Sequence, residues 1–431
     1  MILLLRLLWS YLRTRSLRFA DRAALERHQQ RRLRRFEQSV LTKSPYFSRL
    51  LGTQPGTWPA MNKHVMMENF NDINTAGLNL SQVLSTALKS EATRDFSPTV
   101  GRHSVGLSSG TSGRRGVFVV SPEEQARWAG VMLAKLLPKG LLNGERVALF
   151  LRANNNLYKT VRTPWLAFRF FDLFVPFETL MSGLRGYAPT IVVAPAQVLR
   201  ALAIAHREGR IDLRRVKAIS VAEVLEPQDR VLLRESFAEL GEVYQATEGF
   251  LGATCAHGTL HLNEEFLKVE PEWLDDTRFV PVVTDFTRST QPVVRYRLDD
   301  ILVRRTTPCP CGSPTLALAA IEGRCDDLLR LPGADGRWVD VFADVVSRAL
   351  AQSLPATCDY RLVQSSADTL ELHVPANASV AAAAQAHLCD VFARLGVCVP
   401  RLRWRIAHQL PAANFATKRR RITRHREAVG S

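Results

Sequence analysis

The central part of the chain alternates short apolar runs with amphipathic helical patterns. The apolar runs are typical of buried strands and cover residues 147–151, 190–195, 216–221 and 281–286. Helical periodicity covers residues 199–209 and 228–240. Strands and helices in series are typical of a parallel sheet with crossover helices. The pattern therefore predicts an α/β fold with mixed or parallel sheets.

The pattern changes on both sides of this region. Residues 1–95 predict a helical lead-in. From about residue 331, a Gly-rich turn is followed by a helix, two strands, a helix and a strand. Such a series is typical of a compact α+β unit of about 100 residues. We therefore expect a large N-terminal domain, residues 1–325, and a small mobile C-terminal domain, residues 326–431.

Composition places the chain among ordinary globular proteins. It has 431 residues, of which 46% are hydrophobic and 23% are charged, so it has ample apolar material for a core. Seven cysteines are an odd number at low density for a chain of this length, so nothing suggests a disulfide framework. We therefore expect a cytoplasmic protein in which clustered cysteines are metal ligands.

The formal net charge of +16 is concentrated at the two ends of the chain. Residues 1–50 carry 12 Lys and Arg against 3 Asp and Glu, and residues 401–431 carry 9 against 1. The 350 residues between them sum to −1. A generally basic surface is therefore absent from the expected fold, which disfavours nucleic acid as a partner.

The first residues, MILLLRLLWSYLRTRSLRF, mix apolar and arginine positions at helical spacing. The apolar run is too short for a membrane span and Arg6 interrupts it. No signal-peptide cleavage site follows. A helix that packs on its own domain is favoured over one that lies on anionic lipid, because a single surface signal binds membranes weakly. The second interpretation would make the protein peripheral at the inner membrane surface.

The loop LSSGTSGRRGV, residues 107–117, predicts a phosphate site. Small residues and glycines let backbone amides converge on phosphate oxygens, and arginine can grip a phosphate with two parallel bonds. The candidate residues are Ser108, Ser109, Gly110, Thr111, Ser112, Gly113 and Arg114. The pattern is neither a P-loop nor a dinucleotide motif, and a polar surface turn is the alternative.

Six segments, in order, resemble motifs of the adenylate-forming superfamily, which includes acyl-CoA synthetases and peptide-synthetase adenylation domains. They are SSGTSGRRG (108–116), ISVAEVL (219–225), YQATEG (244–249), RYRLDDI (295–301), EGRCDDLL (322–329) and NFATKRRRI (414–422). The resemblance is closest to the phenylacetate-CoA ligase branch, and within it to proteins related to the deazaflavin-coenzyme-adenylating synthetases. Each motif is weak by itself, whereas six in order are specific.

The resemblance implies roles for individual residues. The phosphate loop would hold the β- and γ-phosphates of ATP, and Glu248 would ligate Mg²⁺, a cation that prefers oxygen ligands. Lys418 would bridge the carboxylate and the α-phosphate. Arg324 would orient the ribose and phosphate, and Asp326 would be the hinge between domains. The other nucleotide contacts would come from Ala222, Glu223, Tyr244, Thr247 and Asp300.

The sequence departs from the family pattern at three points. Arg114-Arg115-Gly116 stands where relatives often have Lys-Pro, and Asp299 stands where a Gly is common. No Gly immediately precedes Lys418, so Arg419 or Arg420 could be mistaken for it. A solvated basic run is the alternative interpretation of this segment.

Two pairs of residues predict a structural zinc site. Cys309 and Cys311 form a Cys-x-Cys-Gly knuckle, which is half of such a site. Cys255 and His261 offer two further ligands, and Gly258 would let the chain turn between them. Some members of the phenylacetate-CoA ligase branch carry a zinc between these same segments. The alternative is four unrelated residues, since buried thiols are common.

Aromatic residues cluster between residues 165 and 177, where they suggest either an acid pocket or core packing. Core packing is favoured for most of them. The predicted function is ATP- and Mg²⁺-dependent adenylation of a small carboxylic acid, followed by thioester transfer to CoA or an acyl carrier protein. One alternative is an adenylyltransferase that acts on a phenolic hydroxyl of a coenzyme. Another is a non-enzymatic, zinc-stabilised protein that binds nucleic acid or membranes through its basic ends.

Overall fold

The computed structural model describes residues 1–53, 58–94, 97–108, 116–137, 139–151, 166–324, 328–412, 414–415 and 417–425, with only the backbone of Arg324. Helices dominate the first part of the chain. They are α1 (Ile2–Ser16), α2 (Arg22–Ser39), α3 (Pro45–Ser48), α4 (Lys63–Glu68), α5 (Phe70–Ile73) and α6 (Leu80–Thr93). The α2 helix is fixed to the large sheet by Gln29, whose amide donates to the carbonyls of Glu264 and Leu267 at 3.0 Å each.

A small antiparallel sheet follows these helices. It contains β1 (Thr99–Val100), β2 (His103–Leu107) and β3 (Val117–Val120) in that order. The predicted phosphate loop connects β2 to β3. The α7 helix (Pro122–Leu136) begins at Ser121, whose side chain forms a capping box with Glu124.

The core of the molecule is a large mixed sheet. Its strands run β11-β12-β14-β15-β10-β9-β8-β7-β6-β4-β5, and β13 pairs with β12. The parallel part contains β4 (Glu145–Leu151), β5 (Leu166–Asp172), β6 (Ile191–Ala194), β7 (Lys217–Ser220) and β8 (Glu239–Ala246). The helices around it are α9 (Phe177–Tyr187), α10 (Ala196–Arg207) and α11 (Pro227–Ser236). This half is the parallel sheet with crossover helices that the sequence predicts.

The other half of the large sheet is antiparallel. It contains β9 (Gly249–Thr254), β10 (Leu260–Leu262), β11 (Leu267–Trp273), β12 (Arg278–Asp285), β13 (Val293–Arg297), β14 (Asp300–Arg304) and β15 (Ala317–Arg324). The apolar run at 281–286 belongs to β12, which pairs only with antiparallel neighbours. The prediction that this run forms a strand of the parallel sheet was therefore wrong. A strand buried on both faces has the same apolar pattern in either direction.

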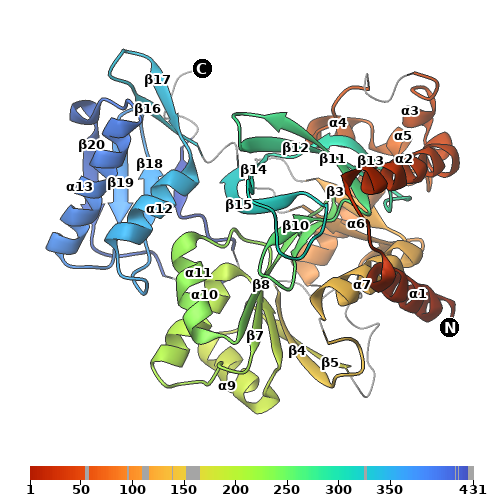
Figure 1. Ribbon diagram of the computed structural model, residues 1–431, viewed down its shortest axis with the longest axis horizontal. Helices are drawn as coiled ribbons and strands as arrows, with labels where there is room; N and C mark the ends of the chain where they lie inside the picture. Colours follow the sequence, from red (N-terminus) through yellow and green to blue (C-terminus); the bar gives the residue numbers. More distant parts are fainter. Residues whose placement is uncertain are drawn as a thin grey trace.

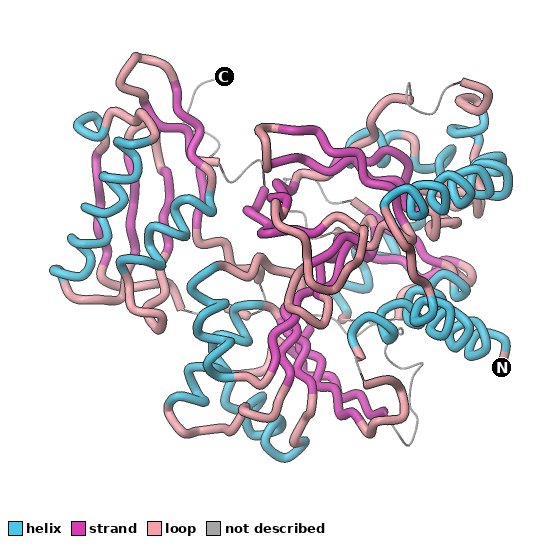
Figure 2. The backbone as a smooth tube through the Cα atoms, in the orientation of Figure 1, coloured by secondary structure: helices cyan, strands magenta, loops and turns pink. Residues whose placement is uncertain are grey.

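A smaller α+β unit stands beside the large sheet (Figures 1 and 2). It begins with the hairpin of β16 (Leu329–Pro332) and β17 (Trp338–Val341), followed by α12 (Ala343–Ser353). Its four-stranded sheet has the order β20-β19-β18-β21. The remaining elements are β18 (Arg361–Gln364), β19 (Thr369–His373), α13 (Ala378–Arg394), β20 (Arg403–Ala407) and β21 (Ile422–Arg424). A separate apolar core, which includes Tyr360 and Phe392, holds this unit together.

Candidate active site

A cavity of about 1170 Å³ lies between the large sheet and the C-terminal unit. Its walls come from α7, β8, β14 and β15 on one side and from α12 and residues 418–422 on the other. Residues from all six sequence motifs therefore meet at one place. The predicted residues that line it are Ser108, Ala222, Glu223, Tyr244, Thr247, Glu248, Asp300 and Lys418.

Tyr244 and Asp300 are hydrogen-bonded within this wall. The Tyr244 hydroxyl on β8 donates to Asp300 Oδ2 on β14 at 2.7 Å. Tyr244 is buried, and Asp300 is half-buried at the start of its strand. The Cα of Asp300 is paired with that of Arg324 on β15, which brings the ends of two motifs together.

Glu248 lies in the short connection between β8 and β9. Its Oε2 accepts a 3.0 Å hydrogen bond from the hydroxyl of the preceding Thr247. Gly249 follows, and a Cβ at this position would lie 2.6 Å from Oδ2 of Asp285. The chain at Gly249 therefore passes close to Asp285, and any larger residue there would force one of them to move.

Asp285 is a buried acid on the cavity that the sequence interpretation missed. Burial raises the pKa of its carboxyl, although hydrogen bonds from Thr287 oppose that shift. Oδ1 accepts from the Thr287 amide at 2.7 Å and from its hydroxyl at 2.6 Å. In the sequence, the only feature that could have indicated this cavity residue is its position as an acid near the end of the apolar run that forms β12.

Ala222 and Glu223 follow strand β7. Ala222 has a φ of +65°, in the left-handed region that residues other than glycine rarely adopt. Glu223 accepts hydrogen bonds from the backbone and side-chain amides of Gln197, at 3.1 and 2.8 Å. It also accepts from the backbone amide of Arg419 at 3.2 Å. Glu223 thus connects the large sheet to the C-terminal unit as well as lining the cavity.

Both neighbours of Lys418 are held by residues that flank the large sheet, Gln197 on α10 and Glu223 after β7. The Gln197 side chain donates to the carbonyl of Thr417 at 2.7 Å, and Arg419 donates its backbone amide to Glu223. These two contacts fix the backbone at Lys418 where its side chain reaches the cavity. The strongly basic segment is therefore docked rather than solvated.

A buried ion network surrounds Arg421. Its guanidinium donates to Asp359 Oδ1 at 2.7 Å, to Glu226 Oε2 at 2.8 Å and to Asp229 Oδ1 at 2.9 Å. Arg419 also pairs with Asp229 and with Asp359. The side chains of Arg419 and Arg421 are therefore both engaged in this network.

Asp229 is the centre of this network and is fully buried. Burial would raise the pKa of its carboxyl, but Arg421, Arg419 and Arg200 together hold that pKa far below the usual range. Arg200 reaches it from α10 at 2.8 Å. The network is formed by residues of both units, so breaking one partner would leave uncompensated buried charge.

Glu322 and Asp344 bring two carboxyl groups together across the same interface. Glu322 lies on β15 and its carboxylate accepts from Arg278 Nε at 2.9 Å, whereas Asp344 belongs to α12. Burial, and then the neighbouring Asp344, raise the pKa of Glu322 to about 7, against the lowering effect of Arg278. Both residues line the cavity.

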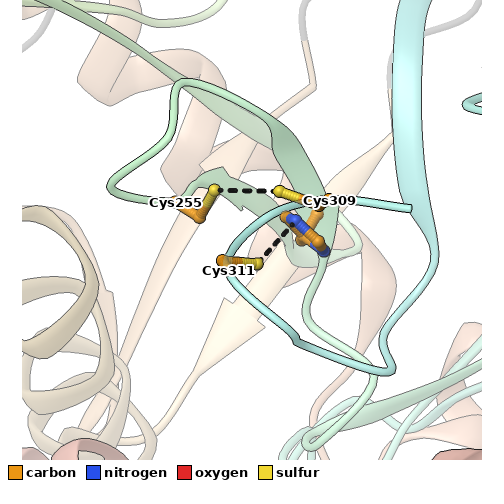
Figure 3. Close-up of side chains that lie close together, drawn as sticks. Cys255, Cys309 and Cys311 are labelled. Atoms are coloured by element: carbon orange, nitrogen blue, oxygen red, sulfur yellow. Dashed lines mark hydrogen bonds between the residues drawn. The ribbon is translucent and has the colours of Figure 1, made fainter. Parts of the chain in front are cut away.

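A second cluster lies behind the cavity wall, where Cys255, His261, Cys309 and Cys311 converge. One ligand atom from each lies within 4.8 Å of all the others. Figure 3 shows the three cysteines approaching from two segments of the chain. Gly258, with a φ of +72°, turns the chain after Cys255, and Gly312, with a φ of +71°, turns it after Cys311. The two pairs predicted from spacing are therefore adjacent in space.

Two distances in the cluster match those of a tetrahedral zinc site. Bonds of about 2.3 Å to sulfur and about 2.0 Å to nitrogen place two sulfurs about 3.8 Å apart, and a sulfur and a nitrogen about 3.5 Å apart. The Cys255 and Cys309 sulfurs are 3.7 Å apart, and Cys311 Sγ is 3.4 Å from His261 Nε2. His261 Nδ1 lies 3.1 Å from Thr315 Oγ1, the kind of contact that orients a metal-binding imidazole.

No protein-family model matches the chain, and no curated protein matches it. Solved structures do. The chain superposes with a TM-score of 0.68 on 2-hydroxyisobutyryl-CoA ligase in its postadenylation state with 2-HIB-AMP, at 17% identity over 94% of this chain and 90% of that one. The protein has the fold of the adenylate-forming CoA ligases. The predicted resemblance is thereby confirmed at the level of the fold.

Other structures with this fold match less closely. The TM-score is 0.56 for an open conformation of the same ligase with 2-HIB-AMP and CoA, at 17% identity over 90% and 89% of the two chains. For MatB from Rhodopseudomonas palustris with ATP it is 0.50, at 13% identity over 73% and 67%.

Several predicted residues lie outside the described part of this ligase-like fold. They are Ser109, Gly110, Thr111, Ser112, Gly113, Arg114 and Asp326. The described ends of the phosphate loop do meet, since the Ser108 amide donates to the Gly116 carbonyl at 2.8 Å. For Arg324 only the backbone is described, at the end of β15.

The aromatic cluster does not form an acid pocket among the described residues. Phe171 is buried and stacks on Phe150 with ring centroids 4.7 Å apart, and Phe174 is exposed. The described aromatics of this cluster are absent from the cavity lining. Trp128 and Met132 on α7 line it instead. The sequence did not indicate that these two residues line the cavity. A residue on a buried helix face has the same helical spacing whether it packs against a core or faces a cavity.

Proposed function

We propose that the protein activates a carboxylic acid with ATP as an acyl adenylate and transfers the acyl group to the thiol of CoA. The proposal rests mainly on one observation. Lys418, Glu248 and Asp300, which come from three separate motifs, line the same cavity between two units with the ligase fold. A neighbour with that fold is described with 2-HIB-AMP and CoA, which are the corresponding intermediate and thiol.

The charges along the cavity suit this reaction. Adenylation brings a carboxylate and the α-phosphate together, so a cation must lie between two anions. Lys418 supplies that charge on the C-terminal side, and the hydrogen bonds of Thr417 and Arg419 preorganise it. On the opposite wall, Asp300 would accept from the ribose hydroxyls while Tyr244 holds its other oxygen.

Glu248 would hold Mg²⁺. Its half-buried carboxylate and the adjacent Thr247 hydroxyl are the oxygen ligands that this cation prefers, so the residues fit. The bound metal would neutralise phosphate charge.

The same motifs assign the remaining contacts to the nucleotide. Ala222 and Glu223 would lie beside adenine, the loop from Ser108 to Arg114 would hold the phosphates, and Arg324 would orient the ribose.

We also propose a structural zinc bound by Cys255, His261, Cys309 and Cys311. The sulfur–sulfur and sulfur–nitrogen distances, and the contact of His261 with Thr315, support it. Cys255 directly follows β9, His261 lies on β10, and the other two ligands lie in the segment between β14 and β15. A zinc there would join the strand that follows Glu248 to the strand that begins at Asp300, and would stiffen the nucleotide wall without contacting substrate.

The boundary between two domains belongs to the same proposal. A large domain would comprise residues 1–325 and a C-terminal lid residues 326–431, with Asp326 as the hinge. The separate apolar core of the C-terminal unit supports this division. A lid that leaves after adenylation would withdraw Lys418 and admit the thiol, a gating motion.

The test is pyrophosphate exchange into ATP across a panel of carboxylic acids. We expect acid-dependent exchange that Lys418→Ala abolishes, while Arg424→Ala, on the described strand β21 after the KRRR run, leaves it intact. Adding CoA with the active acid should release free AMP. No exchange with any acid by the folded protein would contradict adenylation of acids, and AMP retained on a hydroxyl product would indicate an adenylyltransferase instead.

A further inference from the structure

The α1 helix packs on α7 through an unusually polar face. Its buried residues are Leu7, Ser10, Tyr11 and Thr14. The Ser10 hydroxyl donates to the carbonyl of Arg127 at 2.9 Å. Gly130 on α7 makes the approach close, because a Cβ there would lie 2.4 Å from the carbonyl of Leu7. The predicted packing of this helix on its own domain is therefore present, but it uses few of the helix's apolar residues.

The apolar residues of α1 point outward instead. Ile2, Leu5, Trp9 and Leu12 are 69%, 59%, 58% and 64% exposed. At about 100° per residue, these four positions form a stripe roughly opposite the buried face. Single exposed leucines are common on protein surfaces, whereas a continuous apolar stripe marks an interaction site.

Arginines flank this stripe on both sides. By helical spacing, Arg6 and Arg13 lie along one edge and Arg15 along the other, and α1 contains no acidic residue. The Arg13 guanidinium lies 4.9 Å from the centre of the Trp9 ring. Apolar residues bordered by arginines are the pattern of a helix that lies in the headgroup region of a membrane.

The positive surface continues onto the neighbouring helices. Burial, and then the nearby Arg13, Arg127 and Arg35, lower the pKa of Arg32 on α2 against the raising effect of Asp285, so cationic groups of α1, α2 and α7 lie close together here. Residues 1–50 together carry nine more basic than acidic residues. The partner of this surface must therefore be both apolar and anionic.

We propose that α1 docks the protein on the surface of an anionic lipid bilayer. The stripe would enter the boundary between headgroups and acyl chains, and the arginines would contact lipid phosphates. A second copy of the chain is the weaker choice, because it would bring an equally cationic face into contact. None of the described helices is long and apolar enough to cross a membrane.

The position of α1 suits this role. It lies at the edge of the molecule opposite the C-terminal sheet (Figure 1). Docking through α1 would therefore leave the cavity and the C-terminal unit turned away from the bilayer. The inference does not depend on the proposed ligase activity, since it uses neither the cavity nor its residues.

Cosedimentation with vesicles tests the proposal. We expect the protein to bind vesicles of mixed phosphatidylglycerol and phosphatidylcholine at least about ten-fold more tightly than phosphatidylcholine alone, and high salt to weaken binding. The variant Leu5→Ser/Trp9→Ser/Leu12→Ser should lose this binding about ten-fold or more. The matched control, Leu88→Ser/Leu395→Ser, removes exposed leucines from α6 and from the end of α13 and should bind like the parent.

The substituted residues are exposed, so thermal unfolding of both variants should match that of the parent and show that the fold is kept. Emission from Trp9, measured as the difference from a Trp9→Phe variant, should shift to shorter wavelength on the anionic vesicles. Equal binding to both vesicle types, no binding, or unchanged binding by the triple variant would overturn the proposal. A dimer in light scattering that the triple variant dissociates would assign the stripe to a second copy instead.

Discussion

Gln197 on α10 and Thr417 beside Lys418 are joined by a 2.7 Å hydrogen bond across the interface between the large sheet and the C-terminal unit. The same side chain donates to Glu223, which in turn accepts from the amide of Arg419. One glutamine therefore organises contacts on both sides of Lys418. The position of the lysine therefore depends on a residue that is not among those lining the cavity.

Replacing Gln197 by Ala should slow adenylation without abolishing it. The lysine would keep its charge but lose its preorganised position, so we expect kcat for pyrophosphate exchange to fall roughly ten-fold or more. Gln228→Ala is a matched control, because Gln228 also donates across the interface, to the carbonyls of Pro355 and Cys358 at 2.8 and 2.7 Å. A similar loss in both variants would mean that the interface as a whole matters and not the support of Lys418.

The zinc proposal predicts that purified protein contains stoichiometric zinc by elemental analysis and that Cys311→Ser removes it. Without the metal, the segments before and after β10 lose a cross-link, so the free energy of unfolding should fall by about 2–5 kcal/mol. Cys389→Ser, a half-buried cysteine on α13, should keep both zinc and stability. Zinc-free protein with full stability would contradict the proposal.

The pairing of these four ligands was accessible from sequence because each half has a local signature. Cys309 and Cys311 form a knuckle, and a turn glycine lies between Cys255 and His261. The strands β4, β6 and β7 were accessible for the same kind of reason, since each is a short apolar run between turn signals. These turns, knuckles and short strands are determined by residues that are neighbours in the chain, so they can be recognised from the sequence.

The ion network between the large sheet and the C-terminal unit could not be predicted in this way. Asp229 and Arg421 meet at 2.9 Å but are 192 positions apart, and each lies among other charged residues that would normally be solvated. The end of α11 was also misjudged. Residues 228–240 have continuous helical periodicity, yet the helix ends at Ser236 and β8 begins at Glu239. Pairing with β7 supplies hydrogen bonds there that a sequence pattern does not reveal.

Glu322 predicts a pH dependence near neutrality. Its pKa in the folded chain is about 7, above the ordinary value of 4.5, so folding favours the protonated carboxyl. Its contribution to stability is therefore fully present below about pH 4.5 and is lost as the pH rises through 7. In urea unfolding, Glu322→Gln should reduce the decline in stability between these pH values by about 1 kcal/mol or more. Glu272→Gln, which removes an exposed carboxylate on β11, should leave the decline unchanged.

Adding a single methyl group at Gly249, next to the proposed Mg²⁺ ligand, should lower both the stability of the fold and the activity. Gly249→Ala would place a Cβ 2.6 Å from Asp285 Oδ2, so either the Glu248 turn or the buried acid must move. We expect a loss of about 1–3 kcal/mol in stability and a lower rate of pyrophosphate exchange. Gly186→Ala on α9 is the control, because no atom lies within 4 Å of its added Cβ, and it should be neutral or slightly stabilising.

A double-mutant cycle separates this contact from a general effect of alanine on the turn. Asp285→Ala removes the oxygen that the new Cβ would meet, although it also loses the hydrogen bonds from Thr287. The two substitutions should therefore cost less together than the sum of their separate effects, with a coupling of about 0.5–3 kcal/mol. Additive losses would show that Gly249 is required by its own backbone and not by the closeness of Asp285.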